Sequence, residues 1–433
     1  MSKKQVIVLW IVAAVLILAV VVVKSSKSEA FESATARDRG DTLLPDFPAE
    51  QVAKVEIKRG DDTVTLTKGE AGWTVAERDA YPANVSNIND LLRTVDEVKV
   101  TQGIEADPSF APRFGMDPEA TDEEEKGTDL VLSDASGKEL AHLTFGKTLE
   151  AASNPMSPFG GGSSGRFVMN HADESGVYVT SEVFPTLTVM VERWLDDTFL
   201  KVEKIQSIQV SKPGEENETA WEVTRDTENG DFSLVGKADN EELDPTALNP
   251  LKNLFSYARF EDVIPADKAE AIWKKDQRQT AVIKTFEGLT YHVTFGPAEK
   301  EDTADADAPA PESYAMTVTV TGEVPKERKK AEGETEEAAK EADKAFDERK
   351  KALEETLANT RKLEGRVFKV SKYTVEPLLK DRTGLIKSAA PAHTAQPNPG
   401  MPGLPGQAPR RPVQAVTPPI QIPPMPPAND GGE

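Results

Sequence analysis

The sequence predicts an α+β protein: a tandem duplication of a mostly antiparallel sheet unit with a packed helix, preceded by one transmembrane helix and carrying a charged helical insertion in the second unit. Three observations lead to this prediction. Residues 6–23 are an unbroken apolar run, a series of short motifs occurs twice in the same order, and several segments alternate apolar and polar residues, as residues 63–67 do. Such alternation is typical of half-buried antiparallel strands.

The composition restricts the classes of function. The chain has 433 residues, 74 Asp plus Glu against 51 Lys plus Arg, and a net charge of −23. Binding to nucleic acid needs a basic patch, and the sequence contains none, so we expect no nucleic-acid partner. There is no cysteine, which excludes disulfides, thiolate metal sites, a cysteine nucleophile and a lipoprotein anchor.

The apolar run predicts a membrane anchor. A helix over residues 6–23 reaches about 27 Å, close to the hydrocarbon thickness of a bilayer. The run is longer than the apolar part of a cleaved signal peptide, and the A-x-A pattern at residues 34–36 lies far downstream. We expect residues 1–5 in the cytoplasm and a single-pass protein of the cell inner membrane. The bulk of the chain is then periplasmic or otherwise extracytoplasmic, beginning with a polar stalk over residues 24–45.

The duplication predicts one unit over residues 46–203 and a second over residues 204–388. The apolar stripe after Pro82 recurs after Pro245, and residues 142–146 (His-Leu-Thr-Phe-Gly) recur as residues 292–296 (His-Val-Thr-Phe-Gly). Spacings of three and four residues place each stripe on one face of a helix. We therefore expect helices near residues 84–96 and 247–259 to superpose. Trp73 and Trp221, which begin similar strand motifs, should each lie on an adjacent strand.

Two further segments complete the map. Residues 324–364 are rich in Ala, Glu and Lys at helical spacing, with a thin apolar stripe of Phe346, Leu353 and Leu357. This predicts a long charged helix or helical hairpin, which we interpret as a solvated spacer in preference to a docking arm. Residues 389–433 are rich in Pro and Gly and predict a disordered tail with polyproline II character.

The order of these motifs resembles that of a bacterial family, the domain of unknown function 4340. The matching pieces are Gly72-Trp73-Thr74-Val75, Pro82 with Leu91-Leu92, Phe114-Gly115-Met116-Asp117-Pro118, Phe145-Gly146 and Val177-Tyr178-Val179. Members of that family typically have one N-terminal anchor and are often encoded beside ABC-transporter components. The resemblance implies a transporter-associated extracytoplasmic protein and carries over no catalytic residue.

No motif predicts a catalytic residue, a cofactor site or a metal site. The four histidines are His142, His171, His292 and His393, and none has HxxxH or HExxH spacing. His142 and His292 occupy equivalent places in the two units. We expect each to lie on one face of a strand, without convergent carboxylates.

Other polar clusters lack the required patterns. The glycine-rich residues 160–165 lack the lysine of a P-loop and read as a flexible loop, and the acidic residues 122–125 lack the spacing of an EF-hand. The adjacent Asp196 and Asp197 are no evidence for a glycosidase pair, which is defined by its separation in space.

The leading hypothesis is a non-enzymatic interaction or accessory module of an envelope complex, with the membrane and a protein partner as its contacts and an ABC transporter as the associated complex. The alternative is a domain that binds an envelope glycan or other polymer, for which Trp73 and Trp221 would need to be exposed. A third hypothesis is an uncharacterised hydrolase. It would need a concave pocket that holds a histidine and two carboxylates.

Overall fold

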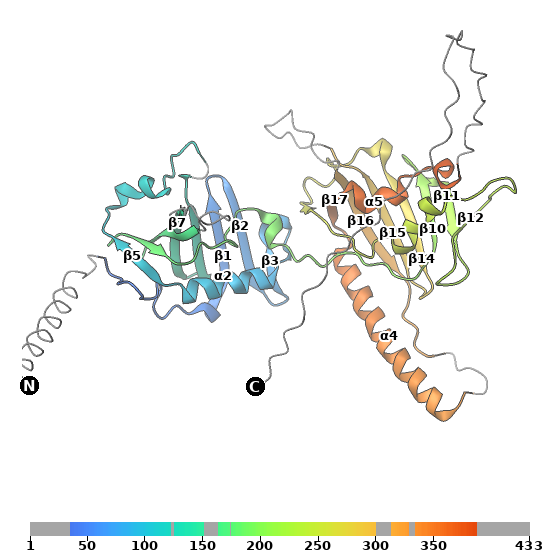
Figure 1. Cartoon of the computed structure of the whole chain (residues 1–433), viewed down its shortest axis with the longest axis horizontal. Coiled ribbons are helices and arrows are strands. Elements are labelled where there is room, and N and C mark those ends of the chain that lie inside the picture. Colours follow the sequence, from blue (N-terminus) through green and yellow to red (C-terminus); the bar gives the residue numbers. More distant parts are fainter. Residues whose placement is uncertain are drawn as a thin grey trace, which may run out of the picture. The chain divides into compact units, whose positions relative to one another are not determined.

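The structure is a computed structural model that describes residues 35–122, 125–150, 163–173, 175–299, 313–328 and 334–387. These residues belong to one compact unit. They form two sheets with few helices, so the α+β class is confirmed, and every strand pair described within the two sheets is antiparallel (Figure 1). The predicted anchor at residues 6–23 and the predicted tail at residues 389–433 lie outside the described residues.

The first sheet has nine strands in the order β4-β3-β2-β1-β6-β7-β8-β9-β5. Helix α2 begins after the N-cap Asn84, whose side chain accepts a hydrogen bond from the Asn87 amide, and it buries Ile88, Leu91, Leu92 and Val95 as the sequence predicts. The bounds of the elements are β1 Val52–Arg59, β2 Asp62–Gly69, β3 Gly72–Val75, β4 Tyr81–Pro82, α2 Val85–Glu97, β5 Val100–Ile104, β6 Thr128–Asp134, β7 Glu139–Glu150, β8 Ser163–Asn170 and β9 Val177–Thr180.

The second sheet has eight strands in the order β12-β11-β10-β14-β15-β16-β17-β13. The bounds of the elements are β10 Ile205–Lys212, β11 Glu215–Thr224, β12 Ser233–Leu234, α3 Pro245–Leu248, β13 Asp262–Ile264, β14 Gln279–Thr285, β15 Thr290–Pro297, β16 Ser313–Thr321, α4 Glu336–Leu363, β17 Val367–Ser371 and α5 Lys372–Val375.

The two sheets repeat one topology. Each strand from β3 to β5 in the first order has a counterpart at the same place in the second order, from β12 to β13. In both halves the end of the unit also returns to the start of its helix. The Asn84 amide donates to the Trp194 carbonyl (2.7 Å), and the Asp244 amide, just before α3, donates to the Leu385 carbonyl (3.0 Å). The predicted repeat of strands therefore agrees with the topology.

Two details of the predicted repeat are wrong. In the second half, α3 ends at Leu248 and continues only as a 3-10 helix, Asn249–Asn253. Pro250 has no amide proton for an α-helical hydrogen bond and its ring crowds the preceding turn. The chain therefore continues from α3 as a 3-10 helix and does not form the predicted helix over residues 247–259.

The predicted match of Trp73 with Trp221 is displaced by one strand. Trp221 lies on β11 opposite Val210, in the place that Val64 has on β2 opposite Ile57. Trp73 lies one strand further out, on β3. By the strand registers its counterpart in the second half is Phe232, the residue just before β12. Short apolar motifs on neighbouring strands are alike, so the sequence predicted the wrong partner for Trp73.

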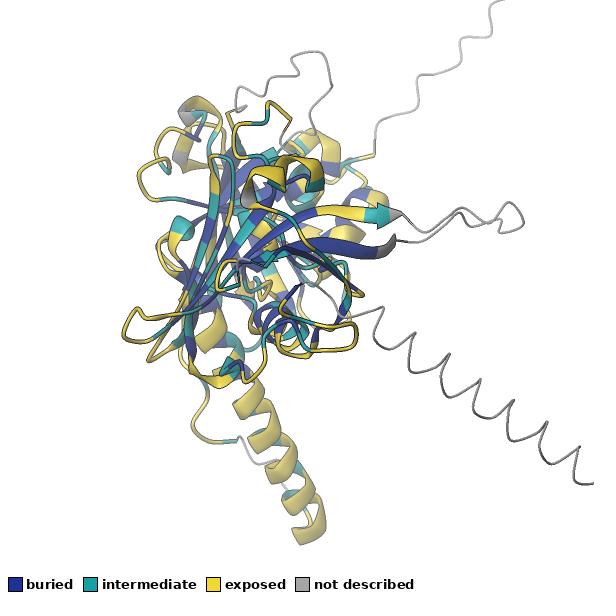
Figure 2. Cartoon of the chain, turned by 90° about the vertical axis from the view of Figure 1, so that its left-hand side faces the viewer, coloured by how far each residue is buried: buried dark blue, intermediate teal, exposed yellow. Residues whose placement is uncertain are grey.

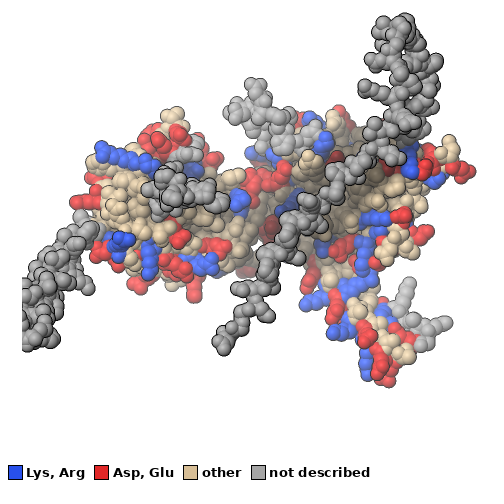
Figure 3. Space-filling model, in the orientation of Figure 1, with Lys and Arg blue, Asp and Glu red and all other residues tan. Residues whose placement is uncertain are grey.

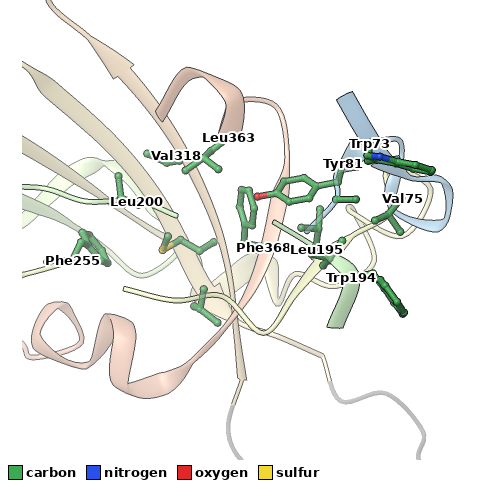
Figure 4. Packing of buried hydrophobic residues seen from close by; sticks show 14 of the residues in the cluster. Trp73, Val75, Tyr81, Trp194, Leu195, Leu200, Phe255, Val318, Leu363 and Phe368 are labelled. Atoms are coloured by element: carbon green, nitrogen blue, oxygen red, sulfur yellow. The ribbon is translucent and has the colours of Figure 1, made fainter. Parts of the chain in front are cut away.

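One apolar cluster extends through both halves. Tyr81 of β4 lies edge-on to Phe368 of β17, with ring centroids 6.2 Å apart (Figure 4). At the same junction Arg78 makes a bidentate ion pair with Asp262, with distances of 2.7 and 2.9 Å. The two halves therefore share a core, although each has its own sheet.

Helix α4 is the predicted charged insertion, and it lies in the connection between β16 and β17. Its buried residues, Leu353, Leu357, Thr360 and Leu363, all belong to its C-terminal half, and its N-terminal half is largely exposed (Figure 2). Acidic and basic side chains alternate along it (Figure 3). Among the described helices none is both long and apolar enough to cross a membrane.

Candidate functional site

Three metal-ligating side chains converge on the first sheet. Asp129, His142 and His171 each offer one ligand atom, and these atoms lie within 4.8 Å of one another. Asp129 and His142 are half-buried and His171 is exposed. Within the described residues this is the group of His, Asp and Glu side chains that is close enough to hold a metal ion.

The β6–β7 hairpin brings Asp129 and His142 together. Its turn is closed by the Asp134 amide, which donates to the Lys138 carbonyl (2.9 Å). A register shift between Leu132 and Ser133 then sets Asp129 opposite Thr144. Side chains two residues apart on a strand share a face, so His142 lies on the same face as Thr144. Leu143 is fully buried on the opposite face, in the core.

His171 reaches the cluster from the turn after β8. Its amide donates to the His142 carbonyl (3.0 Å), which continues the β7–β8 pairing by one residue. The side chain of Asn170 fixes the turn by accepting from the Ala172 amide (3.0 Å). The two imidazole rings then stack, with centroids 3.7 Å apart and planes inclined by 15°.

A hydrogen-bond chain links the carboxylate to one imidazole. The Thr144 hydroxyl donates to Asp129 Oδ1 (2.5 Å), and its oxygen lies 2.7 Å from His171 Nε2. A hydroxyl has one hydrogen, and Thr144 donates it in the hydrogen bond to Asp129. The His171 Nε2–H must therefore be the donor in the contact with the Thr144 oxygen. The chain therefore fixes the tautomer of a neutral His171.

The environment favours the neutral form of His171. Burial lowers the pKa of this imidazole below its ordinary value, and the neighbouring His142 lowers it further, whereas Asp129 and Glu139 act in the opposite direction. At neutral pH the ring is then uncharged, which is the form that binds metal ions.

A pocket of about 160 Å³ adjoins His171. Asp107 and Asp173 also line it, so the pocket holds the histidine and two carboxylates that we expected of a hydrolase. Both carboxylates, however, serve local turns. Asp107 accepts from the Ser109 amide (2.9 Å), and Asp173 accepts from the Ser175 amide (3.0 Å) and from the Tyr178 hydroxyl.

These bonds hold both groups in the ionised form. Hydrogen bonds from Ser109 lower the pKa of Asp107. Burial opposes ionisation of Asp173, but the bonds from Ser175 and Tyr178 more than offset it and keep its pKa below the ordinary value. A serine nucleophile would need its hydroxyl bonded to a base such as His171. Here the Ser175 hydroxyl donates to Asp173 (2.5 Å), and His171 contacts Thr144.

The second sheet has the same positions with different residues. The registers of β14, β15 and β16 match Asp129 with Thr280, Thr144 with Thr294, and His171 with Thr319. His292, the counterpart of His142, is exposed. The duplicated histidine therefore has metal-ligating neighbours in the first half alone.

The expectation that no carboxylate converges on the repeated histidines is wrong for His142. His171 and Asp129 were missed because neither belongs to a repeated motif. The β6–β7 turn alone would not have shown it, because counting back from residues 134–138 pairs Asp129 with Leu143. A register shift between Leu132 and Ser133 makes Thr144 its partner. The position of His171 depends on the pairing of β7 with β8. Residues 151–162 separate these two strands in the sequence, so the register could not be counted across a short turn.

The second half carries an open groove of about 410 Å³. Two aromatic side chains on its rim are unusually exposed, Tyr257 at 93% and Tyr373 at 81%. The wall is largely apolar, with Leu254, Phe255 and Phe260 among its residues. An exposed aromatic pair beside an apolar depression is typical of an interaction surface.

The other residues considered in the sequence have structural surroundings. Trp73 and Trp221 are buried, at 7% and 3% exposure, so neither is an exposed platform. The Trp221 indole donates to the Lys380 carbonyl (2.7 Å). Asp196 accepts from the Thr198 amide (2.8 Å) as a turn cap.

Some expectations concern residues that the structure describes only in part. The glycine-rich segment ends in strand, because β8 begins at Ser163, and a Cβ atom on Gly165 would lie 2.3 Å from the Thr180 carbonyl oxygen. Residues 160–162, residues 123–124 of the acidic run and His393 lie outside the described residues.

The comparisons with known proteins give a family match for part of the chain. The family model of a domain of unknown function, DUF4340, matches residues 73–275, which confirms the resemblance seen in the motifs. The matched segment begins on β3 in the first half and ends before β14 in the second. Neither curated proteins nor solved structures give a match.

Proposed function

We propose that the protein, whose residues 73–275 match the family model of DUF4340, is a membrane-anchored, extracytoplasmic module without enzymatic activity. It would bind a protein partner in an envelope complex associated with an ABC transporter. The location and the transporter come from the apolar residues 6–23 and from the family resemblance. The binding role comes from the surface of the second half.

The observation that carries the binding role is the pair Tyr257 and Tyr373. A tyrosine ring that is exposed in the isolated protein gains free energy when a partner buries it. Tyr is also enriched among the residues that dominate interface energies. The pair borders the groove with Arg259 and Glu261 at the same rim, both exposed. Apolar contacts framed by polar ones are the usual anatomy of a protein interface.

The polymer-binding alternative required Trp73 and Trp221 to be exposed, and both are buried. Net charge gives a further argument for a protein partner. With a net charge of −23 the chain repels acidic polymers. Acidic and basic side chains are interspersed on the face shown in Figure 3, which has no basic strip along which an acidic polymer could bind.

The test is a crosslinking pull-down of the full-length protein from its native membranes, with captured proteins identified and quantified. We expect a defined envelope protein, a component of an ABC transporter, to be recovered with the wild type. The double variant Tyr257→Ala/Tyr373→Ala should reduce its recovery at least about tenfold, because truncating one interface hot spot costs about 2 kcal/mol or more.

The control is Met190→Ala. Met190 is an exposed apolar residue (58%) in the first half and is not among the residues that line the groove. Its substitution should leave recovery unchanged. Equal recovery with all three proteins would contradict the proposed groove, and capture of a glycan in place of a protein would favour the polymer-binding alternative.

A further inference from the structure

We propose that Asp129, His142 and His171 bind a divalent transition-metal ion of the zinc class, a property separate from partner binding. The three groups come from β6, β7 and the turn after β8, and they meet on the face of the first sheet opposite the core. Two imidazoles with one carboxylate are a ligand set that suits zinc and similar divalent metals.

The geometry requires little rearrangement. Ligand atoms about 2.1 Å from a tetrahedral zinc ion lie about 3.4 Å from one another. The three ligand atoms here lie within 4.8 Å, so they need to approach by at most about 1.5 Å. The nitrogen lone pairs of the two stacked rings lie in nearly parallel planes and cannot both point at one ion, so the ring of His171 must tilt away from that of His142. His171 is exposed and has room to do so.

The surroundings supply the orientation that metal ligands need. The Thr144 hydroxyl donates to Asp129 and fixes the direction of its carboxylate. Outer groups of this kind orient ligating side chains and commonly affect metal affinity 10–100-fold. The pocket beside His171 gives access for a water molecule or another ligand at a fourth position.

The second half provides an internal comparison. At the equivalent positions it keeps His292 and Thr294 but has Thr280 and Thr319 in place of the carboxylate and the second imidazole. One imidazole with threonine hydroxyls is a poor ligand set for these metals. The duplicated chain should therefore bind one ion, in the first half.

The test is titration of the purified full-length chain, made without a histidine tag, with Co²⁺ and then Zn²⁺. The chain has four histidines, so each can be assigned. We expect one Co²⁺ per chain, with the visible absorption of low-symmetry coordination, displaced by Zn²⁺. Zn²⁺ should also raise the melting temperature. Asp129→Asn, His142→Ala and His171→Ala should each weaken binding at least about tenfold.

Two matched controls fix the location. His292→Ala and His393→Ala should bind Co²⁺ as the wild type does. Thr144→Val should keep one ion per chain with lower affinity, because it removes the orienting bond and leaves the three ligands. Should a variant of the half-buried Asp129 or His142 fail to fold, the exposed His171 supplies the deciding result through His171→Gln.

The proposal is overturned if the wild type shows no saturable binding at micromolar Co²⁺, if the His171 variants bind as tightly as the wild type, or if His292→Ala abolishes binding. None of these outcomes changes the partner recovery on which the proposed function rests.

Discussion

At the scale of single residues, Gly146 explains one of the family motifs. A Cβ atom at this position would lie 2.1 Å from the Phe114 carbonyl oxygen and 2.9 Å from the Met116 Cε atom. Phe114 and Met116 belong to the Phe-Gly-Met-Asp-Pro loop, which therefore packs directly on β7. The Gly146 carbonyl also accepts from the buried Arg166 (2.8 Å).

Gly146→Ala should destabilise the protein by about 1–3 kcal/mol, because the loop backbone cannot yield without disturbing its packing. Its counterpart Gly296 lies in a half that lacks the loop, and a Cβ atom there would come no closer than 3.3 Å to Arg278. Gly296→Ala should cost no more than about 1 kcal/mol. Urea unfolding of the two variants measures the difference, and equal losses would contradict the close approach of the loop.

A second residue-scale prediction concerns pH. Hydrogen bonds from the Arg382 guanidinium and the Ala238 amide lower the pKa of Glu241 to about 2. A carboxyl with a depressed native pKa contributes stability above its unfolded value, about 4.3, and loses it as the pH falls towards 2. Glu241→Gln should therefore unfold with a weaker pH dependence between about 4.3 and 2. A parallel acid titration of both proteins measures this, and identical slopes would contradict it.

At the scale of elements, the sequence predicted what periodicity can show. Alternation identified strands, and the stripe of Ile88, Leu91 and Val95 identified α2. Charged i,i+4 spacing identified the insertion that is α4. The pairing of strands was beyond reach, because register depends on turns and on long-range contacts. That is why Trp221 was matched with Trp73, and why the convergence of Asp129 with His171 was not foreseen.

Helix α4 offers an element-scale prediction. Leu357 is buried against the second sheet, at 8% exposure, whereas Phe346 of the same predicted stripe is only partly covered. Leu357→Ala should cost about 2–5 kcal/mol and Phe346→Ala about 1 kcal/mol or less. Unfolding midpoints of the two variants test this. A larger loss for Phe346→Ala would mean that the N-terminal half of the helix, and not the C-terminal half, is the packed part.

At the scale of the whole molecule, the two copies of one topology have diverged in different directions. The first half has the cluster of Asp129, His142 and His171 and the Phe-Gly-Met-Asp-Pro loop. The second half has the groove and the inserted α4. The Arg78–Asp262 pair and the shared apolar cluster join the halves. Variants of the Asp129, His142 and His171 cluster should therefore leave partner binding intact, and variants of the groove should leave metal binding intact.

The proposed function requires this module to lie outside the cytoplasm, where its partner must also be. A reporter active only outside the cytoplasm, fused after Glu433, measures this most directly. We expect the fusion to be active, and deletion of residues 6–23 to abolish the activity while a cytoplasmic reporter at the same position gains it. Activity of the full-length chain with the cytoplasmic reporter alone would contradict the location and, with it, the envelope partner.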